Sequence, residues 1–138
     1  MKLYLVTRRD LPPGARAAQL CHALRAFVEA HPAVDSVWYA ESNTLVLLEV
    51  ADEDALMRLA WEATMGGVPW SLFREPDLGD AATAIAIGPT GQTLVRKLPL
   101  ALSTIPGDKA QFGRATDSKS VIAGSIPVVP EYQGEFND

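Results

Sequence analysis

The start of the chain indicates a strand, a sharp turn and a helix, and this order limits the available folds more than any other feature. Leu3 to Thr7 (LYLVT) is a short apolar run that favours β structure and is typical of a buried strand. Pro12–Gly14 then break the chain, and from Ala15 to Ala30 apolar residues recur at helical spacing: Leu20, Leu24, Phe27 and Val28. His31–Pro32 are expected to end this helix, because proline pushes the preceding residue out of the α region.

The rest of the first hundred or so residues alternates between strand and helix patterns. The predicted elements are a strand over Asn43–Val50, a helix after the N-cap Asp52 that stops at Gly66, strands over Trp70–Phe73 and Thr83–Ile87, and a short helix over Gln92–Leu98. The order β-α-β-α-β-β-α predicts an α/β domain with helices on both faces of a small sheet. The first strands are expected to pair in parallel, and the short link before the last strand allows one antiparallel strand.

Composition limits the class of protein. A chain of 138 residues, 48% hydrophobic and 21% charged, is typical of one ordinary globular domain with a proper core. The single cysteine, Cys21, excludes an internal disulfide, favours a reducing compartment, and is most simply a small buried hydrophobic residue. One cysteine with His22 and His31 makes no metal site at this spacing unless carboxylates supply the other ligands. The tryptophans are too scattered to form a base-stacking platform and are expected to pack in the core: Trp38, Trp61 and Trp70.

Charge and hydropathy predict a cytoplasmic protein. The apolar run Leu3–Val6 is far shorter than the core of a signal peptide, and no stretch approaches the length of a membrane span. The net charge of −5 argues against broad, nonspecific binding of nucleic acid. A local basic patch remains possible, because four arginines fall close together: Arg8, Arg9, Arg16 and Arg25.

The chain changes character after Leu102. Ser103 to Asp138 is rich in proline, has few helix signals, and is expected to be an extended or partly disordered appendage to the domain formed by residues 1–102. Its apolar patch from Val121 to Val129 could instead dock on the domain, or on a second copy of the chain, giving a homodimer.

Two polar residues of the first helix are candidates for chemistry. Gln19 lies one turn before His22, and the two are expected on neighbouring faces. An exposed helical histidine is usually only solvated, but a histidine could also hold or activate a water because its ordinary pKa is near neutrality. Gln19 can donate and accept hydrogen bonds at once, although an ordinary surface glutamine is the simpler interpretation.

Charged residues at the end of the first strand allow two interpretations. Arg8, Arg9 and Arg16 could bind phosphate through forked hydrogen bonds, or could be ordinary solvated charges at element ends. Asp10 is most simply a cap for the turn that follows it.

The loop between the last two strands is acidic. Glu75, Asp77 and Asp80 could position a water or an amine, although polar loop residues around a proline and a glycine are the simpler interpretation. Thr83 opens the next strand, where its hydroxyl could bind a substrate carbonyl or only satisfy the local backbone.

Several motifs occur together in the order seen in one known family. They are R-x-D-L at Arg8–Leu11, A-A-Q-x-x-H-A at Ala17–Ala23, D-E before a helix at Asp52–Glu53, and TAIAIGP at Thr83–Pro89. In these stretches the chain resembles the type 2 peptidyl-tRNA hydrolase family, over about residues 2 to 102. The P-x-G-A-x-x-A-Q-x-C-H-A pattern from Pro12 to Ala23 looks closer to its divergent peptidyl-tRNA hydrolase domain-containing branch.

The resemblance implies both a fold and an activity. It implies a three-layer αβα sandwich around a four-stranded mixed sheet with one antiparallel strand. It also implies hydrolysis of the ester of peptidyl-tRNA, a carboxylic ester, without a metal or other cofactor. The residues expected to serve catalysis are His22, Gln19, Glu75, Thr83 and Asp10, with Arg8 and Arg16 expected to bind the substrate.

The chain departs from the family pattern at the turn and in one loop. Two lysines of the main branch are replaced by Pro13 and Ala15, and its D-A-G-x-T-Q-I segment by a shorter loop from Glu75. Arg16 is expected to supply the missing positive charge, and Glu75 the missing carboxylate. The alternative is a module of the same fold that binds tRNA or a protein without catalysis.

Overall fold

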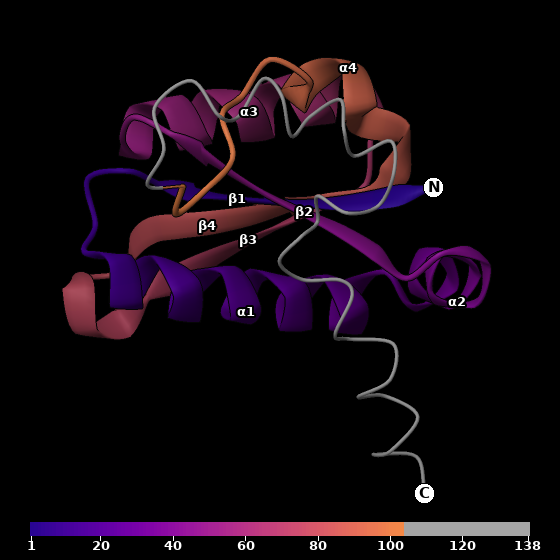
Figure 1. Ribbon diagram of the computed structural model, residues 1–138, viewed down its shortest axis with the longest axis horizontal. Coiled ribbons are helices and arrows are strands. Elements are labelled where there is room, and N and C mark those ends of the chain that lie inside the picture. Colours follow the sequence, from indigo (N-terminus) through magenta and orange to yellow (C-terminus); the bar gives the residue numbers. More distant parts are fainter. Residues whose placement is uncertain (104–138) are drawn as a thin grey trace, which may run out of the picture. The chain divides into compact units, whose positions relative to one another are not determined.

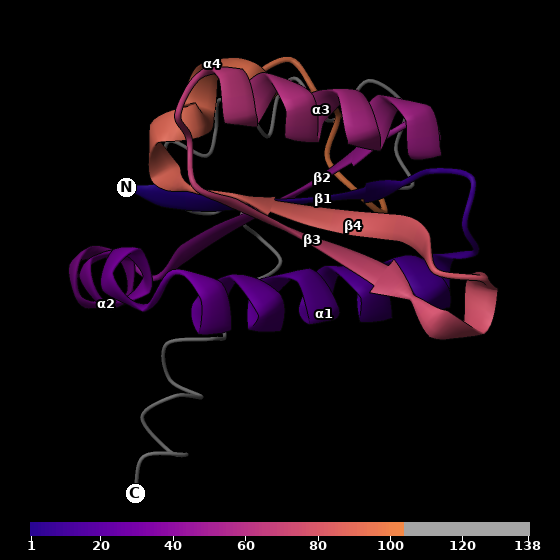
Figure 2. The same ribbon diagram turned by 180° about the vertical axis from the view of Figure 1, so that it is seen from behind.

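A four-stranded sheet lies between two layers of helices in the computed structural model, which describes residues 1–103 (Figure 1). Helices α1 and α2 cover one face, and α3 and α4 cover the other (Figures 1 and 2). The strands are β1 (Lys2–Arg8), β2 (Thr44–Val50), β3 (Trp70–Glu75) and β4 (Ala81–Ile87). The helices are α1 (Pro13–Ala30), α2 (Pro32–Glu41), α3 (Glu53–Met65) and α4 (Gln92–Val95), with the single turns η1 (Pro76–Leu78) and η2 (Pro89–Gly91).

The sheet is mixed and has the order β2-β1-β4-β3. β1 pairs in parallel with β2, while β4 pairs antiparallel with both β1 and β3. β4 is therefore the one strand that runs against the other three. The predicted α/β sandwich with one antiparallel strand is confirmed.

Two hydrophobic clusters fill the space on either side of the sheet, because residues of β1 alternate between its faces. Leu3 and Leu5 pack toward α1, in a cluster that also holds Phe27. Tyr4 and Val6 pack toward α3 in the second cluster. A strand that is buried on both faces reads as a continuous apolar run, which is why Leu3 to Thr7 could be recognised from the sequence.

A β-bulge interrupts the pairing of β3 with β4. Phe73 pairs with Ala84, but the next residue, Arg74, pairs with Ala82, so Thr83 is the extra residue. Ala84 packs in the cluster under α1 and Ala82 in the cluster under α3. Because a bulge breaks the alternation of side chains, Thr83 shares the α1 side with Ala84.

The outer edge of β2 is partly covered by the segment after α4. Leu48 and Leu100 form an antiparallel bridge. The N–H of Glu49 donates to the carbonyl of Pro99 at 3.1 Å, and the N–H of Ala101 donates to the carbonyl of Leu47 at 2.8 Å. The last described residues therefore lie along β2, paired with it by these backbone hydrogen bonds.

The structure differs from the sequence-based expectations in one additional helix and in the ends of two elements. Pro32 ends α1 as expected, but it also begins α2, because proline suits the first position of a helix. α2 was not predicted. The last helix ends at Val95 and not at Leu98, and β3 extends to Glu75.

Two predictions of burial are wrong. Cys21 is exposed, because it lies on the outer side of α1, one position beyond the buried Leu20. Among the tryptophans, Trp38 is buried, but Trp61 is 62% exposed on the outer side of α3. Helical periodicity fixes the buried face, and neither Cys21 nor Trp61 lies on it.

Within residues 1–103, no helix is long and apolar enough to cross a membrane. The expectations for the tail after Ser103 lie outside the described residues.

Candidate functional site

Gln19 is held inside the protein by its place on α1. The helix begins at Pro13 and turns Gln19, Leu20 and Ala23 toward the sheet. Gln19 is only 6% exposed, so the interpretation as an ordinary surface glutamine is wrong. A buried amide needs partners for its oxygen and its nitrogen.

Those partners are Thr83 and Glu75. The hydroxyl of Thr83 donates to Oε1 of Gln19 at 2.6 Å. Nε2 of Gln19 donates to Oε1 of Glu75 at 2.8 Å. An ionised carboxylate only accepts hydrogen bonds, so the amide nitrogen must face Glu75 and the amide oxygen must face Thr83. This arrangement, called here the Thr83–Gln19–Glu75 chain, connects β4, α1 and the end of β3.

The carboxylate of Glu75 is stabilised in its charged form. The hydrogen bond from Gln19 lowers the pKa of Glu75 below its ordinary value, and the N–H of Asp77 and the nearby charge of His22 lower it further. Asp77 N donates to Oε2 of Glu75 at 3.2 Å, which begins η1. Glu75 is the last residue of β3, and its negative charge is held in place there by two hydrogen bonds. Figure 2 shows the end of β3 beside the start of α1.

His22 lies on the exposed surface of α1. It is close enough to Glu75 for its charge to contribute to the lowered pKa of that carboxyl group. Its ring stacks on the ring of Phe73 with 4.5 Å between centroids and 22° between planes. Phe73 precedes Arg74 and Glu75 on β3, so the same strand supports both His22 and the chain. The contact holds the exposed imidazole in one orientation.

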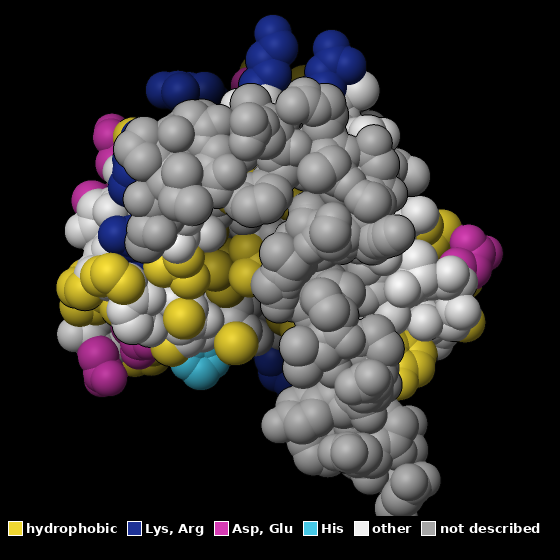
Figure 3. All heavy atoms as spheres, in the orientation of Figure 1, with side chains coloured by type: hydrophobic (Ala, Val, Ile, Leu, Met, Phe, Trp, Pro, Cys, Tyr) yellow, Lys and Arg dark blue, Asp and Glu magenta, His cyan; other side chains and the backbone are white. Residues whose placement is uncertain are grey.

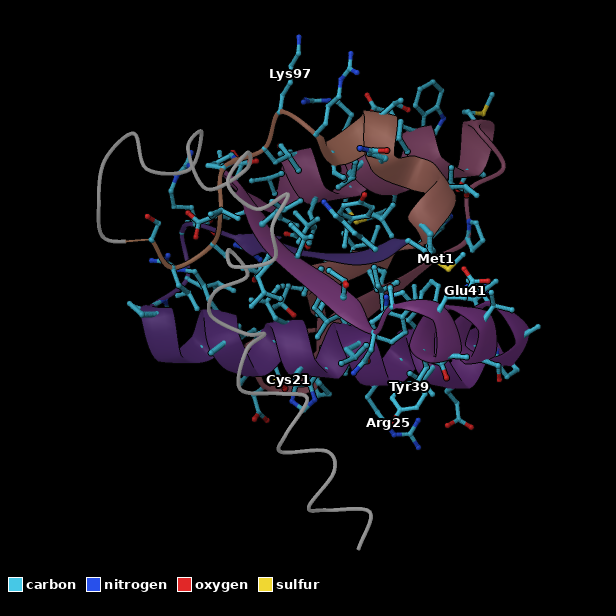
Figure 4. All side chains as sticks on the ribbon, turned by 45° about the vertical axis from the view of Figure 1, so that its right-hand side comes forward. Met1, Cys21, Arg25, Tyr39, Glu41 and Lys97 are labelled. Carbon is cyan, nitrogen blue, oxygen red and sulfur yellow. The ribbon has the colours of Figure 1, made fainter. Side chains whose placement is uncertain are left out.

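The outer side of α1 carries the neighbours of His22. Figure 4 shows Cys21 and Arg25 pointing away from the sheet. Arg25 pairs with Glu29 at 2.7 Å on this exposed surface. Basic side chains also project from the α3 and α4 layer, at the top of Figure 3. Lys97 is labelled on this layer in Figure 4. Those cations lie on the opposite side of the sheet from α1.

Arg8 and Asp10 form a pair of their own. Nε and Nη2 of Arg8 each donate to a carboxylate oxygen of Asp10 at 3.0 Å, and Nη1 donates to the carbonyl of Ala82 at 3.0 Å. The hydrogen bond raises the pKa of Arg8 and lowers the pKa of Asp10. The structure does not bring Asp10 into the Thr83–Gln19–Glu75 chain.

Arg16 is bound to the protein at two points. Nε donates to the carbonyl of Leu11 at 2.7 Å, and Nη1 donates to Oε2 of Glu49 at 3.1 Å. Glu49 is only 6% exposed, and its Oε2 also accepts from the N–H of Leu102 at 3.0 Å. Sequence reasoning missed Glu49, although a lone carboxylate within an apolar strand was a signal that it needed a partner.

No group of His, Cys, Asp and Glu that could hold a metal ion occurs within residues 1–103. The site consists of His22 and Glu75 near the surface, with Gln19 and Thr83 buried behind Glu75. It offers an imidazole for proton transfer and a fixed carboxylate.

Comparisons with known proteins agree on one family. The model of the peptidyl-tRNA hydrolase PTH2 family matches residues 1–105. A protein named peptidyl-tRNA hydrolase from Thermococcus sibiricus is 31% identical over 108 residues, covering 70% of this chain and 91% of the relative. One of the same name from Haloquadratum walsbyi is 31% identical over 112 residues, covering 75% of this chain and 98% of the relative. The resemblance seen in the sequence motifs is confirmed at the level of the family, while the divergent branch stays a prediction.

Proposed function

Because the chain belongs to the peptidyl-tRNA hydrolase PTH2 family, we propose that it hydrolyses the ester that joins a peptide to the 3′ end of tRNA. The observation that supports this activity in this chain is the fixed carboxylate of Glu75 beside the exposed imidazole of His22. An enzyme with this substrate works where translation occurs, so we propose the cytoplasm as its location.

His22 is the proposed general base and general acid. A water attacks the ester carbonyl carbon while a ring nitrogen of His22 accepts a proton from it. When the tetrahedral intermediate collapses, the bond to the ribose oxygen breaks and His22 returns the proton to that oxygen. The products are the peptide carboxylic acid and tRNA with a free hydroxyl.

Glu75 stabilises the positive charge that develops on His22 during proton transfer. Gln19 and Thr83 are buried, with exposures of 6% and 0%, so we assign them the role of holding Glu75 and not of touching the substrate. Phe73 fixes the plane of the imidazole. Proton transfer of this kind contributes about 10²- to 10⁴-fold to rates.

Arg8 and Arg16 are the proposed contacts to phosphates of the acceptor end. A guanidinium has five N–H donors, and the bonds to Asp10, Ala82, Leu11 and Glu49 leave some of these donors on each arginine. Phosphate would therefore add to the existing contacts. Binding by two such charges should weaken as salt rises.

The test is hydrolysis of a peptidyl-tRNA by the purified protein and two variants. His22→Asn should lower kcat by about 100-fold or more. Cys21→Ser is the matched control, because Cys21 is the exposed neighbour on the same helix, and it should change kcat by less than about twofold. Equal activities of the wild type and His22→Asn would contradict the role of His22.

A binding module without catalysis is the second candidate. Pro13 and Ala15 stand at the positions of the family lysines, and this departure is the observation that favours it. A wild-type protein that binds peptidyl-tRNA tightly but leaves the ester intact would establish this alternative and exclude the hydrolase.

A further inference from the structure

We infer that Glu53, at the start of α3, is a positioning residue that holds Thr83 of β4 in place for the Thr83–Gln19–Glu75 chain. The inference rests on the proposed function for its effect on turnover. Glu53 lies on the opposite side of the sheet from Gln19, and it acts through the backbone of Ala82, the residue before Thr83.

Ala82 lies where the pairing of β4 with β1 has stopped, while its pairing with β3 continues beyond the bulge. The pairing of β4 with β1 runs from Ile87 to Ala84, so Ala82 is beyond its end. The bulge then separates Ala82 from Ala84 on the side of β3. Backbone groups that are buried without a partner cost free energy, so Ala82, which is 0% exposed, needs partners other than β1 on that side.

Side chains supply both of those partners. Oε2 of Glu53 accepts from the N–H of Ala82 at 2.8 Å. Nη1 of Arg8 donates to the carbonyl of Ala82 at 3.0 Å. The peptide groups of Ala82 are thus held at both ends, immediately before the residue whose hydroxyl must reach Gln19.

A third side chain holds the other end of the bulge. The hydroxyl of Thr7 donates to the carbonyl of Thr83 at 2.8 Å. With Ala82 and the carbonyl of Thr83 both fixed, the bulged residue directs its hydroxyl to Gln19. Bulges change the direction of a side chain, and here the side chains around the bulge determine that direction.

The contact of Glu53 is not explained by the helix that contains it. Asp52 is the N-cap of α3, and its side chain accepts from the N–H of Ala55 at 3.0 Å. Asp54 also stands in the first turn, where a negative charge suits the helix dipole. Helix capping therefore does not require Glu53 to turn toward β4.

Four variants at two neighbouring positions test the inference. Glu53→Ala removes the acceptor, and Glu53→Asp keeps the charge but shortens the side chain by one methylene. Glu53→Gln keeps an oxygen that can accept from Ala82. Asp54→Ala is the matched control, an exposed carboxylate in the same turn.

In the enzyme assay, Glu53→Ala and Glu53→Asp should lower kcat by about tenfold with KM within about twofold, the pattern of a lost transition-state interaction. Glu53→Gln and Asp54→Ala should stay within about twofold of the wild type. In a Thr83→Val background, which lacks the hydroxyl, Glu53→Ala should cause no further loss. An equal loss in both backgrounds would overturn the inference.

A second readout does not depend on activity. Loss of the Thr83 hydrogen bond frees the amide of Gln19, so NMR titration of Glu53→Ala should show the pKa of Glu75 rising toward its ordinary value. Glu53→Gln and Asp54→Ala should leave that pKa unchanged. If the wild type proves inactive, the titration still decides, and an unchanged Glu75 titration in both Glu53→Ala and Glu53→Asp would refute the inference.

Discussion

The hydroxyl of Thr83 donates a 2.6 Å hydrogen bond to Oε1 of Gln19, a residue 64 positions earlier in the chain. This bond joins the antiparallel strand of the sheet to the helix that carries His22. It fixes the amide of Gln19 so that its nitrogen faces the Glu75 carboxylate. The candidate site thus depends on a buried polar contact between two distant segments.

Loss of the Gln19 side chain should destabilise the protein. In Gln19→Ala the buried hydroxyl of Thr83 loses its acceptor at 2.6 Å and keeps only the long contact to the carbonyl of Phe73 at 3.4 Å. A buried group left poorly satisfied costs about 1 to 3 kcal/mol. Denaturant unfolding followed by circular dichroism measures the change. Gln92→Ala, an exposed glutamine, should cost about 0.5 kcal/mol or less. Equal effects of the two variants would show that the Gln19 contact contributes nothing to stability.

The pKa of Glu75 should depend on the amide of Gln19. Gln19→Met keeps the length of the side chain but removes the N–H donor, which is the main cause of the lowered pKa. The pKa of Glu75 should rise toward its ordinary value, as followed by NMR of the carboxyl carbon. Asp10, whose pKa is lowered by its hydrogen bond with Arg8 and not by Gln19, serves as the internal reference, and its pKa should be the same in both proteins.

The same shift predicts how stability varies with pH. The folded pKa of Glu75 is below its ordinary value of 4.5, so its contribution is present above that pH and lost as pH falls through the folded pKa. Unfolding free energies measured through this acid range should therefore fall less steeply for Glu75→Gln than for the wild type. Parallel curves for the two proteins would disprove the contribution.

Two neighbouring arginines should differ in their effect on stability. Arg16 contacts the buried Glu49 at 3.1 Å, with its own side chain 17% exposed. Arg16→Ala leaves that carboxylate with fewer donors and should cost about 2 kcal/mol. Arg9 is 4.0 Å from the same residue with its side chain 53% exposed, so Arg9→Ala should cost about 0.5 kcal/mol or less. Thermal unfolding of both variants tests the order, and a larger cost for Arg9→Ala would contradict it.

A close approach at Gly91 should make this position intolerant of any side chain. A Cβ there would lie 2.5 Å from Cγ2 of Ile87 and 2.9 Å from Cγ1 of Val68. Gly91→Ala should therefore destabilise the domain by about 1 to 3 kcal/mol, the usual cost of overpacking. At Gly14 in α1 a Cβ meets nothing within 4 Å, so Gly14→Ala should stabilise by about 0.5 to 1 kcal/mol. A calorimetric Tm for each variant distinguishes the opposite signs.

Most of the fold could be predicted because it rests on patterns that are local in sequence. The apolar run Leu3–Thr7 predicted β1, and the helical spacing of apolar residues after Pro13 predicted α1. Asp52 and Gly66 marked the ends of α3 through capping chemistry. α2 was missed because Pro32 can both stop one helix and start another, and the sequence signal for the two cases is the same.

The site could be predicted only in part. Gln19 and His22 were found from their spacing and from the family motif, and Thr83 and Glu75 from the motif and the acidic loop. The part played by Glu53 could not be foreseen, because it depends on a bulge that shifts the register by one residue. Register is a property of two paired strands and cannot be read from one of them.

The segment that pairs with β2 has a consequence for self-association. An open strand edge offers unpaired backbone groups to any other extended chain. Pro99 and Ala101 occupy the groups of Leu47 and Glu49 that would otherwise be offered in this way. A chain shortened before Pro99 would therefore keep its sheet but expose the backbone groups of β2, and we expect it to aggregate by pairing strands between molecules.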